Sequence, residues 1–402
     1  MNIGKIYTWF WILYFPLCIV FYQFIGFDYI DEILTLCMVL VALANNSINK
    51  NPKIRQEIFF YIGIMAFYVI YSYIIKIQVP GGIWLDFQQQ VRPYAVFYCT
   101  LILAPRFTNK QKNRIINIML ACLAIYVIAF RNKVTSITGG GTESVVIGQV
   151  ALVTAMTYYL WKPPTRKNMY IAIAICAFGI LGGKSKFFGE MVAFVAIIYF
   201  LKQKINFNSP QFIFQLILLA VVILFFTWTK FNIYYVEGFS DERLEVLARP
   251  ATYATSLKIL KDYFPFGSGL GSFATSAAAV FYSPIYYKYE LNTIWGLDSA
   301  GGFICDTFYP TLAEFGILGV LLFLIFWKRR INEIQRIHDL RSYRVALMAT
   351  LALALESTAD SSYLSGKGMG YFMLLAICIS STRHIKASKN YKDESIVRRR
   401  FS

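Results

Sequence analysis

Apolar runs about as long as a bilayer crossing recur through this chain from one end to the other. An α-helix needs about 20 apolar residues to cross the hydrocarbon core of a membrane. Because 57% of the 402 residues are hydrophobic and only 15% are charged, a soluble domain of this length could not hide so much apolar surface. The sequence therefore predicts an all-α, polytopic integral membrane protein.

About twelve such runs can be counted, and about ten is equally consistent because some runs are short or weakly apolar. The runs cover residues 8–26, 30–47, 57–76, 93–105, 115–130, 145–161, 169–182, 187–201, 211–229, 309–327, 345–356 and 368–382. The first run has no small-residue cleavage site after it, so we expect a membrane helix there and not a cleaved signal.

Lysine and arginine concentrate in alternate connections between these runs, which predicts their orientation. The basic connections are 48–57, 105–114, 161–168, 202–206 and 327–344. Basic connections face the cytoplasm, so both chain termini are expected on the cytoplasmic side. The net charge of +17 is then a signal of topology, and no nucleic-acid partner is expected.

The predicted organisation has one large segment outside the membrane. Residues 1–229 hold helices one to nine, and residues 230–308 form the large outer loop, which contains helices of its own. Residues 309–382 hold the last three helices, and 383–402 form a basic cytoplasmic tail that anionic lipid attracts. Shorter outer segments are predicted at 77–92, 131–144, 183–186 and 357–367.

A glycine-rich stretch in the large loop places Gly267, Gly269 and Gly271 after a Phe-Pro-Phe step. A dinucleotide site would need a strand before it and a helix after it, and a P-loop would need Gly-Lys-Ser/Thr. Neither context is present, so a nucleotide site is excluded. Alternating glycines supply a tight turn with accessible N–H groups, which is compatible with binding a phosphate or with a compact turn alone.

The residues around this turn resemble the signatures of bacterial O-antigen ligase and polymerase membrane proteins. Arg249 and Tyr253 precede the stretch KDYFPFGSGLGSF (261–273), which is similar to the family's long-loop signature. The stretch DTFYPTLAEFGILG (306–319) resembles the second signature. Upstream, GGKSKFFG (182–189) resembles the Ser-Arg-Gly element, with lysine in place of arginine.

This resemblance implies a glycosyl transfer on the periplasmic face of the bacterial inner membrane. The donor would be a glycan on undecaprenyl diphosphate, and an acceptor hydroxyl would displace the lipid diphosphate with inversion. The resemblance implies no metal and no cofactor. The implied partners are membrane lipids and, in the same pathway, a chain-length regulator and a flippase.

Such a reaction needs cations where negative charge develops on the leaving diphosphate. Arg249 is the first candidate, because a guanidinium group binds phosphate oxygens in a bidentate manner. The candidate helpers are other cations of the outer segments, Arg92, Lys184, Lys186 and Arg243. Their alternative role is local ion pairing, which for Lys186 would involve Glu190 one turn away.

The reaction also needs a base for the acceptor proton. Asp306 stands where the second signature has its polar residue and is the leading candidate, with Asp298 and Glu143 as alternatives. Glu190 and Glu314 lie in or at the edge of predicted spans, where ionisable residues are functional or paired. Glu314 either contributes to substrate binding, with the three glycines of the turn, or caps its own helix.

One departure from the family pattern favours a polymerase over a ligase. Ligases of this family carry a histidine in the second signature, whereas this chain has Cys305 or Asp306 at that place. Its two histidines, His338 and His384, fall in segments expected to face the cytoplasm. We therefore expect a polymerase for O-antigen, capsule or exopolysaccharide. The alternatives are a ligase that transfers glycan to lipid A core and a transporter or flippase of lipid-linked sugars.

Overall fold

The computed structural model describes residues 3–20, 29–45, 52–129, 142–205 and 247–381, with isolated positions between 206 and 246. Arg243, the side chain of Glu143 and most of the predicted run 211–229 lie outside the described residues. Within these ranges all the regular secondary structure is helical. The predicted all-α class is therefore confirmed.

Most of the long helices overlap the predicted apolar runs. The long helices are α1 (Ile3–Val20), α2 (Ile30–Ala44), α3 (Pro52–Ile75), α4 (Pro80–Leu103), α5 (Asn109–Ala129), α7 (Thr142–Trp161), α8 (Arg166–Ala177), α9 (Ser185–Phe200), α15 (Gly316–Gln335), α16 (Leu340–Ala359) and a last helix, Gly366–Ser381. Short 3₁₀ segments continue α8 as η3 (Phe178–Gly182) and precede α15 as η7 (Tyr309–Phe315).

The exception is α4, which begins well before the predicted run 93–105, so most of the predicted outer segment 77–92 is helical. The polar side chains of Asp86, Gln90 and Arg92 broke the apolar pattern in the sequence, but they are buried against other parts of the protein.

Among the described residues, three helices are long and apolar enough to cross a membrane. They are Pro52–Ile75, Asn109–Ala129 and the continuous stretch Tyr309–Gln335, and two shorter apolar helices are Val146–Trp161 and Gly366–Ser381. These helices support a membrane protein. The count of about twelve crossings and the orientation stay predictions.

Buried polar side chains interrupt the apolar character of several other helices. In α4, Asp86, Gln90 and Arg92 are each 5% exposed or less, so they point into the protein and not toward the surroundings. Ionisable side chains inside a membrane bundle are stable only when neighbouring groups pair with them. Asp86 accepts from Gly271 N of the glycine-rich stretch, and Arg92 pairs with Asp31 of α2, so the polar residues of α4 connect it to other parts of the protein.

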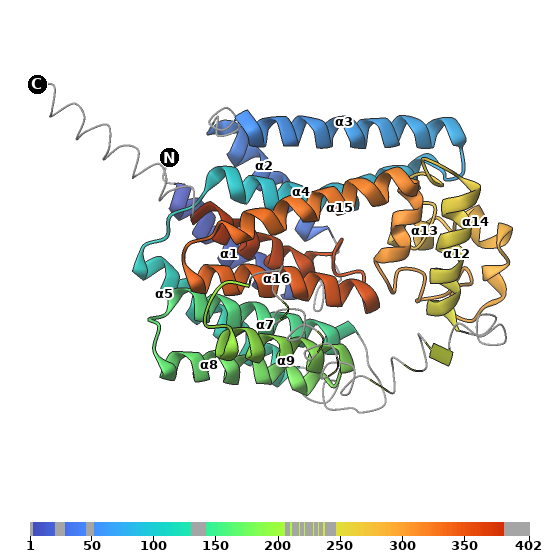
Figure 1. Cartoon of the computed structure of the whole chain (residues 1–402). Helices are drawn as coiled ribbons and strands as arrows, with labels where there is room; N and C mark the ends of the chain where they lie inside the picture. The colour runs from blue at the N-terminus through green and yellow to red at the C-terminus, as the bar shows by residue number, and fades with distance from the viewer. Residues whose placement is uncertain are drawn as a thin grey trace, which may run out of the picture.

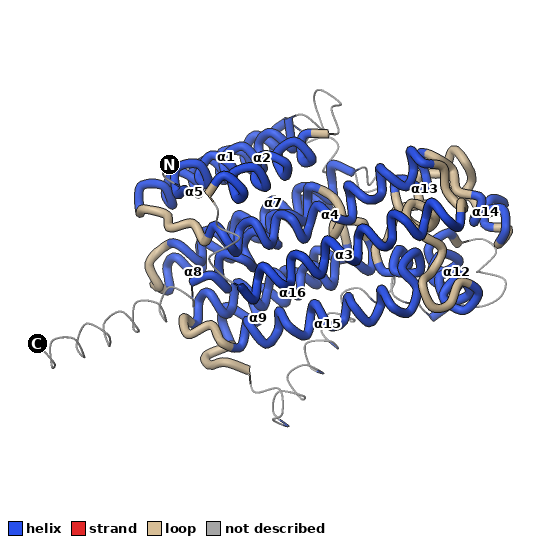
Figure 2. The backbone as a smooth tube through the Cα atoms, turned by 90° about the horizontal axis from the view of Figure 1, so that it is seen from above, coloured by secondary structure: helices blue, strands red, loops and turns tan. Residues whose placement is uncertain are grey.

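The long helices lie side by side in a bundle, and residues 247–308 gather at one end of it. Figure 1 shows α3 along one edge of the bundle and α8 along the opposite edge, with α12 (Ala248–Asp262), α13 (Ser276–Val280) and α14 (Pro284–Lys288) together at one end. The view from above agrees (Figure 2). We call residues 247–308 the end segment; it corresponds to the described part of the predicted outer loop.

The glycine-rich turn fastens the end segment to the bundle. Tyr71 of α3 donates a hydrogen bond from its hydroxyl to Gly267 O at 2.9 Å, and Gln78 donates from Nε2 to Gly271 O at 2.6 Å. Gln78 lies in the connection between α3 and α4. The turn is therefore held by the last part of α3 and by the residues that follow it.

The N–H groups of the three glycines donate to protein acceptors. For Gly267, Gly269 and Gly271 the acceptors are Tyr263 O at 2.7 Å, Glu314 O at 2.9 Å and Asp86 Oδ2 at 3.0 Å, respectively. An anion-binding turn needs amide groups that point at the ligand. In this structure the amides of Gly269 and Gly271 instead connect the turn to η7 and α4, and that of Gly267 connects it to Tyr263. A direct role of these glycines in substrate binding stays a prediction.

Two of the glycines have a steric reason for having no side chain. Gly267 has a φ of +82°, and a Cβ there would lie 2.3 Å from Ala313 O. Gly271 has a φ of +71°, and a Cβ there would lie 2.6 Å from Gly82 O. Both the backbone conformation and the close approach of a neighbouring backbone therefore require glycine. The compact-turn interpretation accounts for both positions.

We expect Gly267→Ala to destabilise the protein by about 2 kcal/mol or more, because the left-handed conformation and the backbone overlap both disfavour a Cβ. The measurement is thermal unfolding of the purified protein in detergent. Gly302→Ala is the matched control, since Gly302 lies in the same segment and a Cβ there meets no atom within 4 Å. Equal Tm values for the two variants would contradict this account of the turn.

Candidate functional site

Arg249 and Asp306 form an ion pair across the end segment. Arg249 Nη2 contacts Asp306 Oδ2, and the two side chains are 16% and 30% exposed. Arg249 lies in the first turn of α12, where Pro250 is tolerated because a helix needs no N–H donor there. Asp306 lies shortly before η7. The two residues of the predicted catalytic pair, 57 positions apart, are therefore brought together.

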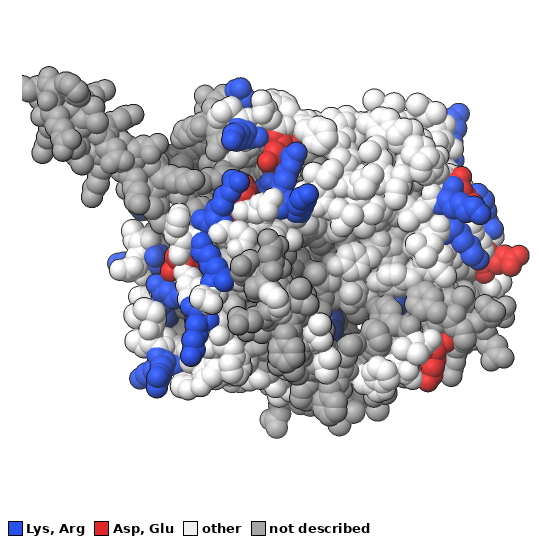
Figure 3. Space-filling view, in the orientation of Figure 1, with Lys and Arg blue, Asp and Glu red and all other residues white. Residues whose placement is uncertain are grey.

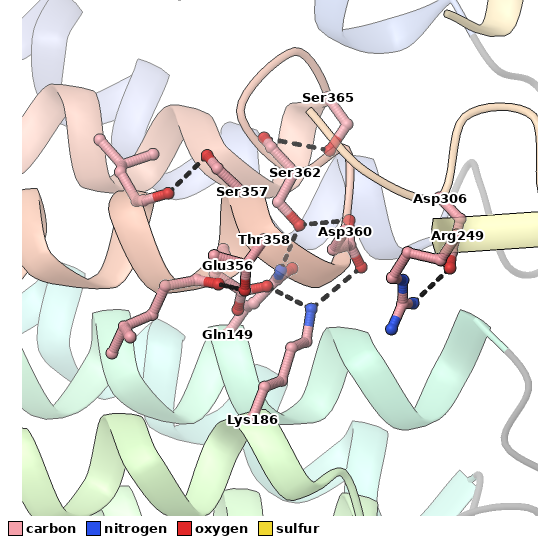
Figure 4. A network of polar contacts seen from close by, with 12 residues as sticks. Gln149, Lys186, Arg249, Asp306, Glu356, Ser357, Thr358, Asp360, Ser362 and Ser365 are labelled. Carbon is pink, nitrogen blue, oxygen red and sulfur yellow. Dashed lines mark hydrogen bonds and ion pairs between the residues drawn. The ribbon is translucent and has the colours of Figure 1, made fainter. Parts of the chain in front are cut away.

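Lys186 forms a second group of ion pairs beside the first. Its Nζ contacts Glu356 Oε2 and lies 3.2 Å from Asp360 Oδ2. Lys186 lies in the first turn of α9, Glu356 lies near the end of α16, and Asp360 follows that helix. Figure 4 shows the lysine reaching from its helix toward both carboxylates, with Arg249 and Asp306 beside them.

Hydrogen bonds fix Asp360 on its other side. Ser362 donates from Oγ to Asp360 Oδ1 at 2.6 Å, and Gln149 of α7 donates from Nε2 to Ser362 Oγ at 2.5 Å. Gln149, Glu356 and Ser362 are each no more than 2% exposed. Four segments of the chain therefore meet at these carboxylates: α7, α9, α16 and residues 360–365, which we call the 360–365 loop (Figure 4).

The surroundings shift the pKa values of the two aspartates in opposite directions. Burial raises the pKa of the Asp306 carboxyl above its ordinary value, and Arg249 only partly offsets this. Burial would also raise the pKa of Asp360, but Lys186 and Lys367 outweigh it and lower that pKa to about 2. Opposed shifts of neighbouring carboxyl groups mark one group that stays charged and one that exchanges protons. Lys186 and Lys367 therefore favour the charged form of Asp360, and Asp306 is the better candidate for proton transfer.

The ion pairs of Arg249 and Lys186 belong to one electrostatic site. Asp360 and Lys186 both contribute to the shift at Asp306, and Asp306 and Asp360 both act on the thiol of Cys305. Burial is the largest cause of the raised pKa of that thiol. A site in which two carboxylates and several cations influence one another can bind an anion and move a proton in the same place.

Glu190 lies at the deep side of this site. It is fully buried, and its carboxyl group interacts with the carboxyl group of Glu356. The sequence suggested Glu190 as the local partner of Lys186, but the ion pairs of Lys186 are with Glu356 and Asp360. The end of α16 and the loop after it pack against the start of α9 and bring Glu356 and Asp360 to Lys186. The spacing of residues in the sequence does not show this packing.

Arg92 lies in a different ion-pair network. Its guanidinium contacts the carboxylates of Asp31 and Glu32 in the first turn of α2 and donates to Leu364 O at 3.1 Å. The side chain is 5% exposed. Arg92 therefore acts on the site through the backbone of the 360–365 loop, which it holds at Leu364. Substrate binding by Arg92 itself stays a prediction.

Aromatic packing holds the same loop against η7. The ring of Tyr363 stacks on that of Phe308 with a centroid distance of 4.1 Å. Phe308 N donates to Ser357 O at 3.1 Å, and Tyr253 of α12 donates from its hydroxyl to Thr358 O at 3.2 Å. These contacts position the two residues before Phe308, which include Asp306, beside the end of α16.

The remaining predicted residues have structural partners. Glu314 is fully buried and accepts from Phe273 N at 2.7 Å, so it holds the glycine-rich turn. Asp298 accepts from Ala300 N at 2.8 Å within its own turn. Lys184 directly precedes α9. Substrate binding by Glu314 stays a prediction, and Arg243 and the side chain of Glu143 lie outside the described residues.

Several residues of the site were not singled out from the sequence, namely Gln149, Glu356, Asp360, Ser362 and Lys367. One signal for them was present. Glu356 ends an otherwise apolar run, and ionisable residues in such runs are functional or paired. Asp360 and Lys367 lie in the predicted outer segment 357–367, where no pattern in the sequence marks them as functional. Their proximity to Lys186 depends on how the helices pack.

Metal ligation has no geometric basis in the part of the chain that the structure describes. No group of three or more His, Cys, Asp or Glu residues there is arranged to hold a metal ion.

The chain was also compared with protein-family models and with curated proteins, and it matches none of them.

We expect Lys186→Met to lower the stability of the protein by about 3 kcal/mol, because it leaves the buried carboxylates of Glu356 and Asp360 without their cation. Thermal unfolding in detergent measures the loss. Lys202→Met, at an exposed lysine just after α9, is the control and should leave Tm within a degree or so of the unmodified protein.

Addition of Glu356→Gln to Lys186→Met should restore part of that stability, since one of the uncompensated charges is then removed. If the double variant is no more stable than Lys186→Met alone, the ion pair does not hold α9 to α16 as described.

Proposed function

We propose that this protein is a membrane glycosyltransferase that joins undecaprenyl-diphosphate-linked oligosaccharide units into a polysaccharide. The observation that carries the proposal is the convergence of Lys186, Arg249 and Asp306. These residues come from three separate stretches that resemble the O-antigen ligase and polymerase signatures, and they lie in one charged site. The proposed location is the periplasmic face of the bacterial inner membrane, with both termini in the cytoplasm.

The proposed reaction uses each group of the site in one role. The acceptor hydroxyl oxygen forms a bond to the anomeric carbon of the donor. The bond from that carbon to the diphosphate oxygen breaks, and its electron pair leaves with the lipid diphosphate. Asp306 takes the hydroxyl proton as general base, and Arg249 and Lys186 compensate the charge that develops on the diphosphate.

The ion pair between Arg249 and Asp306 suits a site that awaits an anionic substrate. A diphosphate offers the guanidinium oxygen acceptors in the same bidentate geometry as a carboxylate. When Arg249 binds the diphosphate, Asp306 loses its cationic partner and becomes a stronger base. Asp360 keeps its charge and holds Lys186 in place. Binding of the donor therefore prepares the base for the acceptor.

A polymerase is favoured over a ligase because the described site holds no histidine. His338 lies in the connection between α15 and α16, away from Asp306 before η7, and His384 lies outside the described residues. The ligase remains the second candidate, and a transporter or flippase of lipid-linked sugars the third. A chain-length regulator and the flippase of the same pathway are the proposed partners.

Purified protein given lipid-linked repeat units should produce ladders of increasing length on a gel. Asp306→Asn should slow elongation roughly 10²–10⁴-fold through loss of the base, and Arg249→Ala roughly 10²–10³-fold through loss of charge stabilisation. Lys258→Ala, at an exposed lysine of α12, is the matched control and should elongate normally.

Membrane levels of all three variants should equal those of the unmodified protein. Undiminished ladders from Arg249→Ala or Asp306→Asn would remove that residue from the proposed site. Transfer of glycan to lipid A core without elongation would replace the polymerase by a ligase.

The pH dependence of elongation tests the role of Asp306 as base. The base must be ionised, so the rate should fall as the pH drops through the pKa of Asp306. Because that pKa is raised, the fall should begin at a higher pH than for an ordinary aspartate, whose pKa is about 3.9. In Arg249→Gln the residual rate of elongation should begin to fall at a still higher pH, because Arg249 lowers the pKa of Asp306.

Lys258→Gln should leave unchanged the pH at which the rate of elongation falls on acidification. If that pH is unchanged or lower in Arg249→Gln, the assignment of Asp306 as the base is contradicted.

A further inference from the structure

A second site lies between α3 and α15, and none of the charged residues of the proposed reaction lines it. It is a cavity of about 110 Å³ between these helices. Its lining is mostly aromatic and aliphatic, and it includes Tyr61, Ile64, Tyr94, Leu322, Phe323 and Phe326. For scale, an engineered apolar cavity of about 150 Å³ binds benzene. The cavity therefore has room for a segment of one hydrocarbon chain.

The cavity exists because α3 and α15 are tied together at their ends. At one end, the hydroxyl of Tyr68 donates to Phe315 O at 2.6 Å. At the other end, Arg330 Nη2 lies 2.8 Å from Glu57 Oε2. Between these ties Gly319 lines the cavity without a side chain to fill it. The gap is thus a built feature of the helix pair.

The opening of the cavity faces the surroundings of the bundle. Phe60 of α3 and Ile325 of α15 line it and are 58% and 46% exposed. Both helices belong to the candidate membrane spans Pro52–Ile75 and Tyr309–Gln335. Apolar side chains exposed on such helices contact lipid acyl chains in a bilayer. The substance that can enter the cavity from the side is therefore membrane lipid.

The far end of the cavity is positively charged. Arg329 lines it, is 53% exposed and lies 3.9 Å from Glu57 Oε1. Arg330 is 1% exposed and is held by Glu57, by Glu333 at 3.1 Å and by the rings of Phe97 and Phe326 at 5.2 Å each. Arg330 is thus buried among these carboxylates and rings, while Arg329 presents its charge outward.

Further cations surround this end of the groove, and they outnumber the two carboxylates, Glu57 and Glu333. The exposed cations on the same parts of α3 and α15 and just beyond are Lys53, Arg55, Lys328 and Arg336. Figure 3 shows Lys and Arg side chains gathered over this region, beside the uncharged face of α3. An apolar groove that ends in clustered cations complements an anionic lipid.

We propose that this groove binds one anionic phospholipid of the surrounding leaflet. An acyl chain segment lies between α3 and α15, and the phosphate lies at Arg329. The lipid-linked donor is not the proposed occupant. Its diphosphate belongs at Arg249 and Asp306, near the start of α15, whereas Arg329 lies thirteen residues along that helix, or roughly 20 Å away. The proposal therefore does not depend on the proposed enzymatic activity.

The test uses the full-length protein purified in detergent, with phosphatidylglycerol and phosphatidylcholine of identical acyl chains as probes. Native mass spectrometry counts retained lipid, and thermal unfolding against lipid concentration gives the affinity. We expect one phosphatidylglycerol per chain and a rise in Tm at lower concentrations than with phosphatidylcholine. Equal affinities for the two lipids, or no bound phosphatidylglycerol, would overturn the proposal.

Variants separate the groove from general surface charge. Arg329→Gln should weaken the affinity for phosphatidylglycerol roughly fivefold, because one cation near an anionic lipid surface contributes about that factor to binding. Lys328→Gln removes the same charge from an exposed neighbour that does not line the cavity, and it should change the affinity less. Leu322→Trp should fill the cavity and abolish retention of either lipid.

Equal losses from Arg329→Gln and Lys328→Gln would reduce the effect to surface charge and refute the groove. Unchanged binding by a folded Leu322→Trp protein would also refute it. If Leu322→Trp does not fold, the comparison of the two charge variants decides the question, because both positions are exposed.

Discussion

The buried ion pairs of Lys186 with Glu356 and Asp360 organise the site described above. They join the start of α9 to the end of α16, and they do so in a part of the bundle from which water is largely excluded. Charges in such surroundings are stable only when opposite charges and hydrogen-bond donors surround them. Ser362 donates to Asp360, and Gln149 in turn donates to the hydroxyl of Ser362. The position of every other functional side chain is then set relative to this anchored group.

The 360–365 loop transmits that anchoring to the end segment. Lys186 holds it at Asp360 and Arg92 holds it at Leu364, while Tyr363 stacks on Phe308. Because Asp306 directly precedes this packed region, its carboxylate is held beside Arg249 and near Asp360. The glycine-rich turn acts at a different place. Its amides and carbonyls fasten the end segment to α3, α4 and η7, so it supports the site from outside.

The helices were predictable from sequence, while the composition of the site was predictable only in part. Long apolar runs dictate helices, since backbone groups in an apolar medium must satisfy one another within the segment. Arg249, Asp306 and Lys186 were found through motifs. Asp360 and Glu356 were not, because nothing in their spacing relates them to Lys186, which lies 170 or more positions away. For the glycine-rich turn, the sequence left a phosphate loop and a compact turn open, and the hydrogen-bond partners favour the compact turn.

Residue order alone was sufficient for the all-helical class and for the approximate places of most helices, because these depend on local hydrophobicity. The early start of α4 and the steric need for glycine at Gly267 and Gly271 were decided by the tertiary structure, in which backbone from distant segments lies against the turn. Only the tertiary structure decided which partner each charged residue takes and which helices pack together. Arg92 pairs with α2, Lys186 pairs with residues after α16, and α3 and α15 enclose an apolar groove with a cationic end. Such choices depend on which helix faces pack together, and the strength of a charge pair depends on burial that only packing creates.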